Sequence, residues 1–333
     1  MTNRVALVAG QTTRGGEAIG CADSRSPDLR RMLQLGLATV WLLDGLLQLQ
    51  PFMFTAHFGA MLRGTAAGNP QLVARSIIWN AGIVGHHSVV TNATFALVQV
   101  LLGLGIAWRM SLKAALAASI AWSLGIWWFG EGLGGVLSGN ASPIGGGPGA
   151  VLVYALVALL LWPADRVGSD PPFAAARALG IAAARAIWAL LWGGLACLTL
   201  VGNGRSSEGV HDLLKGLAAG EPRWLAALDL HLASVLAHRG VAVSVSLAAL
   251  FTVVAVAVYL PSRAARVSVA AAVLLSLVIW VIGENFGAVL GGGQATDPNS
   301  GPLLILFSLS YWPARPRMAT RDDPATAVAL ETS

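Results

Sequence analysis

The sequence predicts an all-α membrane protein whose eight transmembrane helices form two parallel four-helix repeats. Three observations predict this fold class. Apolar residues make up 56% of the 333 residues and charged residues only 11%, whereas soluble proteins carry about 25% charged residues. Eight apolar segments have lengths typical of complete or slightly short membrane spans. Two blocks of sequence also recur about 152 residues apart. With only two cysteines, a disulfide scaffold is excluded as well.

The spans are apolar stretches bounded by polar or basic residues. A helix needs about 20 mostly apolar residues to cross the hydrocarbon core. The expected spans are Leu33–Gln50, Ser88–Trp108, Leu112–Gly130, Gly147–Pro163, Ala178–Val201, Gly240–Leu260, Val267–Gly283 and Gly301–Pro313. Residues 32–165 then form the first repeat and 166–314 the second, with cytoplasmic tails at 1–31 and 315–333. The first tail lacks the apolar region of a cleavable signal peptide, and its polar composition predicts disorder.

The basic residues predict the orientation. Eight spans place both termini on one side, and fifteen of the 21 Lys and Arg residues fall on that side. The positive-inside rule therefore predicts cytoplasmic termini, in the inner membrane of a bacterium. The net charge of +5 does not indicate nucleic-acid binding, because the arginines lie between apolar segments and form no patch. The expected partner is the lipid bilayer, with a membrane-protein partner or a second copy of the chain also open.

An internal duplication is the strongest pattern in the chain. Met61–Pro70 matches Leu213–Pro222 at six of ten positions, at an offset of 152. Ile126–Gly139 matches Ile279–Gly292 at eight of fourteen positions, at an offset of 153. Two long matches at nearly one offset predict a repeat. Four spans per unit give both units the same orientation, so the repeat is parallel.

Two long segments, 51–87 and 202–239, are expected on the outer side of the membrane. Both carry apolar residues at helical spacing after an Asn-Pro or Glu-Pro pair, which is typical of a helix start. One interpretation is a short helix that lies in the membrane interface. The other is a lid over an outward-facing cavity.

Glu131 and Glu284 are the first candidates for a binding site. Each follows an apolar helix that carries Trp128 or Trp280, and each precedes a glycine-rich stretch. A carboxylate at this depth is costly unless it is paired or hydrated, and glycine frees backbone groups for a ligand. Two such acids facing one central cavity could bind a cation or share a proton. Alternatively, both are helix-end glutamates in interfacial water.

Asp44 is the second candidate, because it lies inside the first span. The matching region of the second repeat, Leu191–Gly194, has no acid. Gln48 follows Asp44 at a spacing of four, so both side chains lie on one helical face. An intramembrane acid predicts a buried partner or a wet cavity; an interfacial aspartate is the other interpretation.

The histidines all fall in the segments expected outside the cytoplasm. His86, His87 and His238 are the metal-ligand candidates, because neutral imidazole binds copper, zinc and haem iron. Their spacing matches no known metal motif, and interfacial histidines that bind water are the simpler interpretation. No cofactor is therefore assigned, with haem, copper or quinone left open.

Three stretches, Trp41–Phe54, Ala67–Pro70 and Trp127–Gly135, resemble a family of uncharacterised bacterial integral membrane proteins that is common in actinobacteria. The resemblance implies a membrane location and no particular chemistry. The span count of each unit is also similar to that of the four-helix DoxX-type membrane proteins, which are associated with quinone and thiol redox.

Three functions stay open on the sequence. The first is binding or transport of a small solute or cation at an outward-facing polar site. The second is a redox- or metal-linked membrane enzyme or accessory protein. The third is a structural subunit of a membrane complex without a site of its own. The intramembrane acids favour the first.

Overall fold

The structure is a computed structural model, which describes residues 28–166 and 171–314; within these ranges it contains helices and turns and no strand. The segments 1–27 and 315–333, where tails are predicted, lie outside the described residues. The result agrees with the predicted all-α class.

The two halves of the chain contain similar series of helices that differ in their short elements. The first half contains α1 (Leu29–Leu47), η1 (Pro51–Phe54), α2 (Ala56–Gly64), α3 (Gln71–His86), α4 (Ser88–Ala107), α5 (Leu112–Phe129), η2 (Gly132–Gly135), η3 (Pro143–Gly145) and α6 (Ala150–Leu160). After α7 (Ala174–Leu179), the second half contains α8 (Ile181–Thr199), η4 (Gly202–Arg205), α9 (Gly209–Leu217), α10 (Arg223–Leu236), α11 (Gly240–Ala257), α12 (Ser262–Val278), η5 (Ile279–Gly283), η6 (Asn285–Ala288) and α13 (Ser300–Leu309).

Five helices of the described chain are long and apolar enough to cross a membrane, as expected of an all-α membrane protein. They are α4, α5, α8, α11 and α12 with its continuation η5. The helix α1 has 19 residues but carries Arg30, Arg31 and Asp44. The helices α6 and α13 are apolar but only 11 and 10 residues long. The predicted count of eight spans is therefore still a prediction.

Local signals explain where the helices differ from the expected spans. Helix α1 begins four residues earlier than expected because Asp28 caps it, its side chain accepting a hydrogen bond from the Arg30 backbone N–H. Helix α6 begins only after Gly149, whose φ is 110°, so it starts later than the expected Gly147, and it ends at Leu160, before Pro163. Helix α13 begins directly after Asn299, whose φ is 65°, and is shorter than expected because it ends at Leu309, before Pro313. A residue with positive φ does not continue a right-handed helix.

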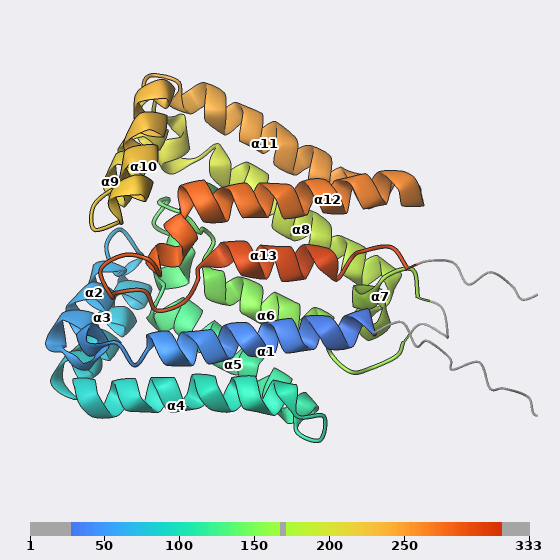
Figure 1. The fold of residues 1–333 in the computed structure, drawn as a ribbon, viewed down its shortest axis with the longest axis horizontal. Helices are drawn as coiled ribbons and strands as arrows, with labels where there is room; N and C mark the ends of the chain where they lie inside the picture. Colours follow the sequence, from blue (N-terminus) through green and yellow to red (C-terminus); the bar gives the residue numbers. More distant parts are fainter. Residues whose placement is uncertain (1–27, 167–170, 315–333) are drawn as a thin grey trace, which may run out of the picture.

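The long helices run side by side along the molecule, and α2, α3, α9 and α10 gather at one end (Figure 1). Helix α1 packs on α4 and α8 packs on α11, while α5 packs on α6 and α12 packs on α13. Contacts of α13 with α6 and α1 join the two halves. The described chain starts and ends at the end opposite α2 and α9 (Figure 1). The packed centre includes the fully buried side chains Tyr154, Val157 and Phe307.

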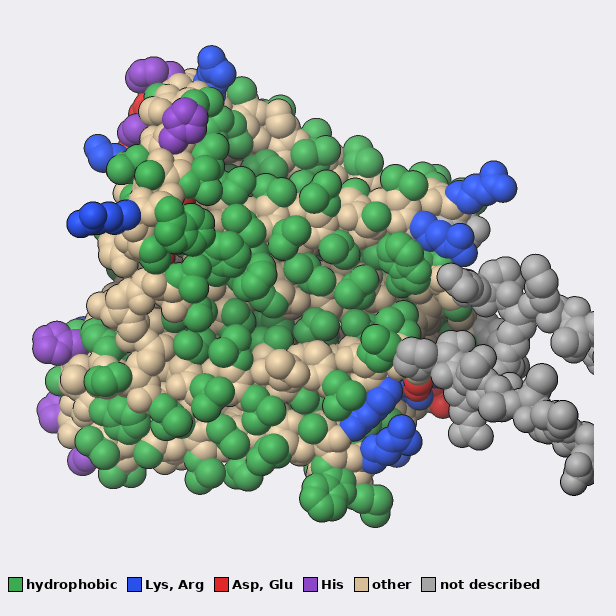
Figure 2. All heavy atoms as spheres, in the orientation of Figure 1, with side chains coloured by type: hydrophobic (Ala, Val, Ile, Leu, Met, Phe, Trp, Pro, Cys, Tyr) green, Lys and Arg blue, Asp and Glu red, His purple; other side chains and the backbone are tan. Residues whose placement is uncertain are grey.

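The side of the bundle is covered by apolar side chains, while Lys and Arg lie at its two ends (Figure 2). Large apolar side chains are exposed along the long helices; Leu101, Val253 and Leu274 are each more than half exposed. Water-soluble monomers rarely expose apolar patches of this extent. The histidines gather at the end of α2, α3, α9 and α10 (Figure 2).

Candidate functional site

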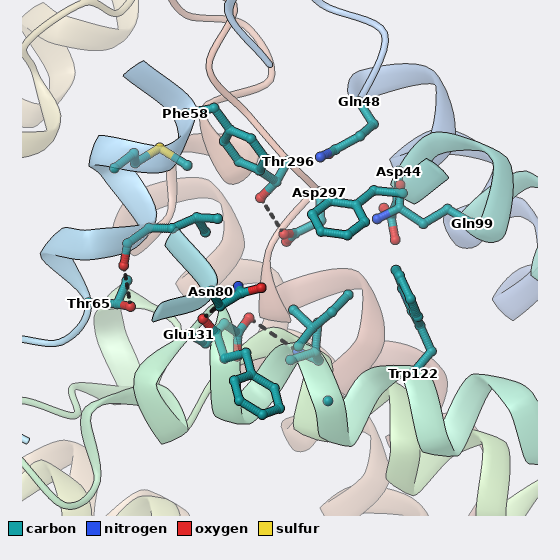
Figure 3. Close-up of a pocket in the computed structure, with 18 of the residues that line it drawn as sticks. Asp44, Gln48, Phe58, Thr65, Asn80, Gln99, Trp122, Glu131, Thr296 and Asp297 are labelled. Carbon is teal, nitrogen blue, oxygen red and sulfur yellow. Dashed lines mark hydrogen bonds between the residues drawn. The ribbon is translucent and has the colours of Figure 1, made fainter. Parts of the chain in front are cut away.

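A cavity of about 530 Å³ lies mainly in the first half of the chain, between the long helices and the helices α2 and α3. Figure 3 shows it with polar groups that converge from several elements. Its polar lining comprises Asp44, Gln48, Thr65, Asn80, Gln99, Glu131, Thr296 and Asp297. Most of the remaining lining is apolar and includes Trp41, Phe58, Phe95, Trp122 and Phe129. The volume is in the range of small-molecule pockets, about 300–1,000 Å³.

Asp44 is placed by the last turn of α1 and is only 2% exposed. Its Oδ2 accepts a hydrogen bond from the hydroxyl group of Tyr154 on α6. Its Oδ1 has no hydrogen-bond partner in the described chain. The ring of Trp41, one turn earlier on α1, packs on the Tyr154 ring with centroids 4.3 Å apart. One carboxylate oxygen is thus anchored and the other is free to bind a donor.

Glu131 lies two residues beyond the end of α5, where the chain leaves the helix. The backbone N–H groups of Gly130 and Glu131 both donate to the carbonyl of Ile126, which closes the helix. The Oε1 atom of Glu131 accepts a hydrogen bond from the backbone N–H of Val151 at 3.4 Å. Val151 lies at the start of α6, where the helix dipole favours an anion. The Oε2 atom of Glu131 has no partner in the described chain. Burial, followed by the charge of Asp297, raises the pKa of Glu131 from 4.5 to about 8.

Asp297 enters the cavity from the loop before α13, in the second half of the chain (Figure 3). Its Oδ2 accepts the Thr296 hydroxyl at 2.8 Å and its Oδ1 accepts the Asn299 backbone N–H at 2.7 Å. Burial raises the pKa of Asp297 above its ordinary value. Gln50 fastens the loop, because its Nε2 donates to the carbonyl of Ala295 at 3.0 Å. The cavity is therefore closed by both halves of the chain.

Two buried amides extend the polar wall. Gln48 is 2% exposed and Gln99 is 7% exposed, and the side-chain oxygen of each has no partner in the described chain. Both side chains project toward the space beside Asp297 (Figure 3). Buried polar groups in folded proteins nearly always have a hydrogen-bond partner. These amides therefore point to a bound molecule or water in the cavity.

The cavity lining contains carboxylates and no cationic side chain. Among the residues that the structure describes, no Lys, Arg or His lines it. Three carboxyl groups, Asp44, Glu131 and Asp297, share the space with aromatic rings. Phe95 meets Trp122 edge to face, with centroids 5.7 Å apart, and the Trp122 Nε1–H has no partner in the described chain. Chemically, this arrangement suits a positively charged or proton-donating guest.

Glu284 does not share this cavity, so the expected facing pair of Glu131 and Glu284 is not brought together. Both of its oxygens are engaged: Oε1 accepts the Ser300 hydroxyl and Oε2 accepts the Gly301 backbone N–H at 3.0 Å. Burial raises its pKa to about 7, against the lowering effect of these hydrogen bonds. Glu284 thus binds the start of α13, as Glu131 binds the start of α6.

The tryptophan candidates also lie outside the cavity lining. Trp128 donates its Nε1–H to the Ser76 hydroxyl at 2.8 Å, and so joins α5 to α3. Trp280 donates to the carbonyl of Pro298 at 2.8 Å and meets Phe286 edge to face. Both side chains thus link segments of the fold by hydrogen bonds: Trp128 links α5 to α3, and Trp280 links η5 to the loop before α13.

The histidine candidates are separated. His86 Nδ1 is 2.7 Å from the Gly82 carbonyl within α3, and His238 contacts Glu208 after α10. No group of three or more His, Cys, Asp or Glu side chains in the described chain is arranged to hold a metal ion. Metal binding by His86, His87 and His238 stays a prediction without a shared site.

Sequence reasoning missed the lining residues Gln99 and Asp297 and also Tyr154, which donates to Asp44. Gln99 is one of two amide side chains, with Asn92, in the mostly apolar helix α4, and Tyr154 is one of only three tyrosines. Both could have been selected as polar groups inside spans. Asp297 had no such signal, because only the fold brings its loop to the first half of the chain.

No protein-family model, no curated protein and no solved structure matches this chain. The resemblance to uncharacterised bacterial membrane proteins stays a prediction, and function is inferred from the cavity alone.

Proposed function

We propose that this membrane protein binds and transports a small cation or cationic solute through the cavity lined by Asp44, Glu131 and Asp297. The observation that carries the proposal is the free oxygen on both Asp44 and Glu131, inside a cavity without a cationic side chain among the described residues. Buried carboxylates without partners are costly unless a cation or proton compensates them. A solute that neutralises them is therefore bound strongly.

The proposed topology has eight spans in the bacterial inner membrane, with both termini in the cytoplasm. It is supported by the predominance of Lys and Arg on the terminal side and by α1 starting and α13 ending at one end of the bundle (Figure 1). The cavity then opens toward the outer side, beneath α2 and α3. Phe58 and Met61 of α2, Thr65 directly after it and Asn80 of α3 line it, which supports the lid interpretation for this outer segment.

The proposed parallel repeat is supported by matched local structure. Trp127 donates to the Pro148 carbonyl at 2.7 Å, as Trp280 does to that of Pro298 at 2.8 Å. The turns after α5 and after η5 both contain four consecutive residues with positive φ, at 132–135 and 285–288. Paired units of this kind form the frame of many transporters.

The test is flux into proteoliposomes, with Na⁺, K⁺ and methylammonium as probes. We expect uptake of at least one probe above protein-free liposomes, and a loss of at least about tenfold in Asp44→Asn and Glu131→Gln. Glu284→Gln is the matched control, because this glutamate follows the same kind of helix but lies outside the cavity. Equal flux in the wild type and both cavity variants would sink the proposal. A visible absorption band in the purified protein would instead favour the redox alternative.

A further inference from the structure

The cavity is much larger than a metal-ion site. About 530 Å³ of space is bounded by carboxyl groups that come from α1, the end of α5 and the loop before α13. A desolvated metal ion needs several ligands within about 2.0–2.6 Å of one point. No group of three such side chains exists in the described chain. A larger guest fits the space better than a bare ion does.

The polar wall of the cavity is rich in groups that accept hydrogen bonds. Asp44 Oδ1 and Glu131 Oε2 are buried without partners. Gln48 and Gln99 add two amides that are more than nine-tenths buried, unpartnered at oxygen and directed into the same space (Figure 3). A carboxylate accepts and cannot donate, and an amide can turn to present either atom. Beside these four acceptors, only the Trp122 Nε1–H is an unpartnered buried donor in the lining described, so the missing partner is mainly a donor with several N–H groups.

The remaining walls are aromatic. Trp41, Phe58, Phe95, Trp122 and Phe129 line the cavity. Aromatic faces attract a cation through the ring quadrupole, and they also bury apolar carbon. An inorganic cation with its water shell gains little from such walls. An organic cation gains from both the rings and the carboxylates.

We infer that the guest is a protonated organic amine with an apolar body, whose ammonium group lies between Asp44 and Glu131 and whose carbon skeleton lies against the aromatic walls. This inference rests on the proposed function and names its substrate class. Gln48 and Gln99 hold the ammonium group in place and determine its orientation. Asp297 supplies a third negative charge from the second half of the chain and favours cations over neutral isosteres.

The test is equilibrium binding to the full-length protein in lipid nanodiscs, followed by quenching of tryptophan fluorescence and by calorimetry. The amine probes are butylamine, phenethylamine and tryptamine at pH 8. The matched probes are 2-phenylethanol, which is neutral, 3-phenylpropionate, which is anionic, and NaCl. We expect at least one amine to bind at least about tenfold more tightly than 2-phenylethanol, and we expect no detectable binding of 3-phenylpropionate.

Variants test the contributions of the aromatic walls and of the polar wall separately. Trp122→Leu should weaken phenethylamine binding about three- to thirtyfold through the lost ring, while Trp128→Leu, outside the cavity, is the control. Asp44→Asn should reduce the preference for phenethylamine over 2-phenylethanol, which a merely structural role of Asp44 would leave unchanged. If Asp44→Asn does not fold, Gln99→Leu provides the second test: it should weaken the amine and leave 2-phenylethanol unaffected.

The outcomes distinguish this inference from the proposed function. Binding of none of the three amines, or equal binding of 2-phenylethanol, overturns the amine assignment. If Na⁺ or K⁺ flux still depends on Asp44 and Glu131, the proposed function survives that result. If no probe shows acid-dependent flux and no amine binds, both fail.

Discussion

The pKa of Glu131 predicts a steep pH dependence of amine binding. Its carboxyl group titrates near pH 8, and the neutral form dominates below that value. An ammonium group is attracted to the ionised form, so the proton and the guest compete for one site. Raising the pH through 8 ionises Glu131 and strengthens binding; lowering the pH protonates it and weakens binding.

The magnitude follows from the ionised fraction. With a pKa of about 8, roughly 50% of Glu131 is ionised at pH 8 and roughly 1% at pH 6. Because apparent affinity scales with the competent fraction, the Kd should rise about fiftyfold between these pH values. The probe does not itself titrate, since alkylammonium groups resemble lysine, whose pKa is about 10.4.

The assay is phenethylamine binding in nanodiscs between pH 6 and pH 8. Glu131→Gln should flatten the profile and bind more weakly than the wild type at pH 8. Glu284→Gln should keep the wild-type slope, although the pKa of Glu284 is also raised, to about 7, because this side chain does not line the cavity. Identical affinities at pH 6 and pH 8 in the wild type would refute the reasoning.

The raised pKa of Glu131 affects stability in the opposite direction to amine binding: a higher pH lowers the free energy of unfolding. The folded protein binds the Glu131 proton more tightly than a chain with the ordinary pKa of 4.5 does. The unfolded state therefore loses its proton first as pH rises, and the free energy of unfolding falls between about pH 4.5 and pH 8. The melting temperature in detergent should be lower at pH 8 than at pH 5.5, and phenethylamine should recover part of the loss. A melting temperature that rises over this range contradicts the assignment.

Three further predictions concern the frame of the site. Tyr154→Phe should lower the free energy of unfolding by about 1–3 kcal/mol, because a buried carboxylate loses its donor; thermal unfolding in detergent measures this. Gly134→Ala should destabilise the fold by at least about 1–3 kcal/mol, because Gly134 has a φ of 59° and its added Cβ would meet the Pro148 backbone, whereas Gly292→Ala, with open space around it, should be neutral. Single cysteines at Arg109 and Ser207, in a background without the two native cysteines, should react with impermeant maleimide from opposite sides; reaction from one side only contradicts the proposed topology.

The sequence predicts three of the polar residues that line the cavity. The spacing of Asp44 and Gln48 predicts that they share one helical face, and both line the cavity. Glu131 is predicted as an acid at the end of an apolar helix, and it lines the cavity as well. These predictions depended on local periodicity and on the cost of a buried charge, which a single segment reveals.

Other parts depend on tertiary structure and were out of reach. Glu131 and Glu284 have nearly the same sequence context, yet only Glu131 keeps a free buried oxygen. The difference comes from Ser300, whose hydroxyl donates a hydrogen bond to one carboxylate oxygen of Glu284. Ser300 is the first residue of α13; the first residue of α6 is Ala150, which has no hydroxyl group to donate to Glu131. Asp297 enters a cavity formed by distant helices, and no local pattern encodes that contact.

Under the predicted duplication, the polar residues of the site can be compared with their counterparts in the second half. Helices α1 and α8 are both 19 residues long, and their sixteenth residues are Asp44 and Ala196. The twelfth residues of α4 and α11 are Gln99 and Phe251. Asp44 and Gln99 of the first half therefore have apolar counterparts in the second, whereas Glu131 is matched by Glu284.

The fifth residues of the two short helices α6 and α13 continue this pattern, because they are Tyr154 and Leu304. In the second half, Phe251 is fully buried and packs on Trp192 with centroids 5.8 Å apart. A close-packed aromatic pair leaves no room for a guest there. The second half thus supplies packing and the Asp297 loop, while the first half keeps the polar groups. Replacing Gln99 with Phe should therefore fill the cavity and abolish amine binding without unfolding the protein, as measured by calorimetry and thermal unfolding; retained binding in a folded Gln99→Phe variant would contradict this division of roles.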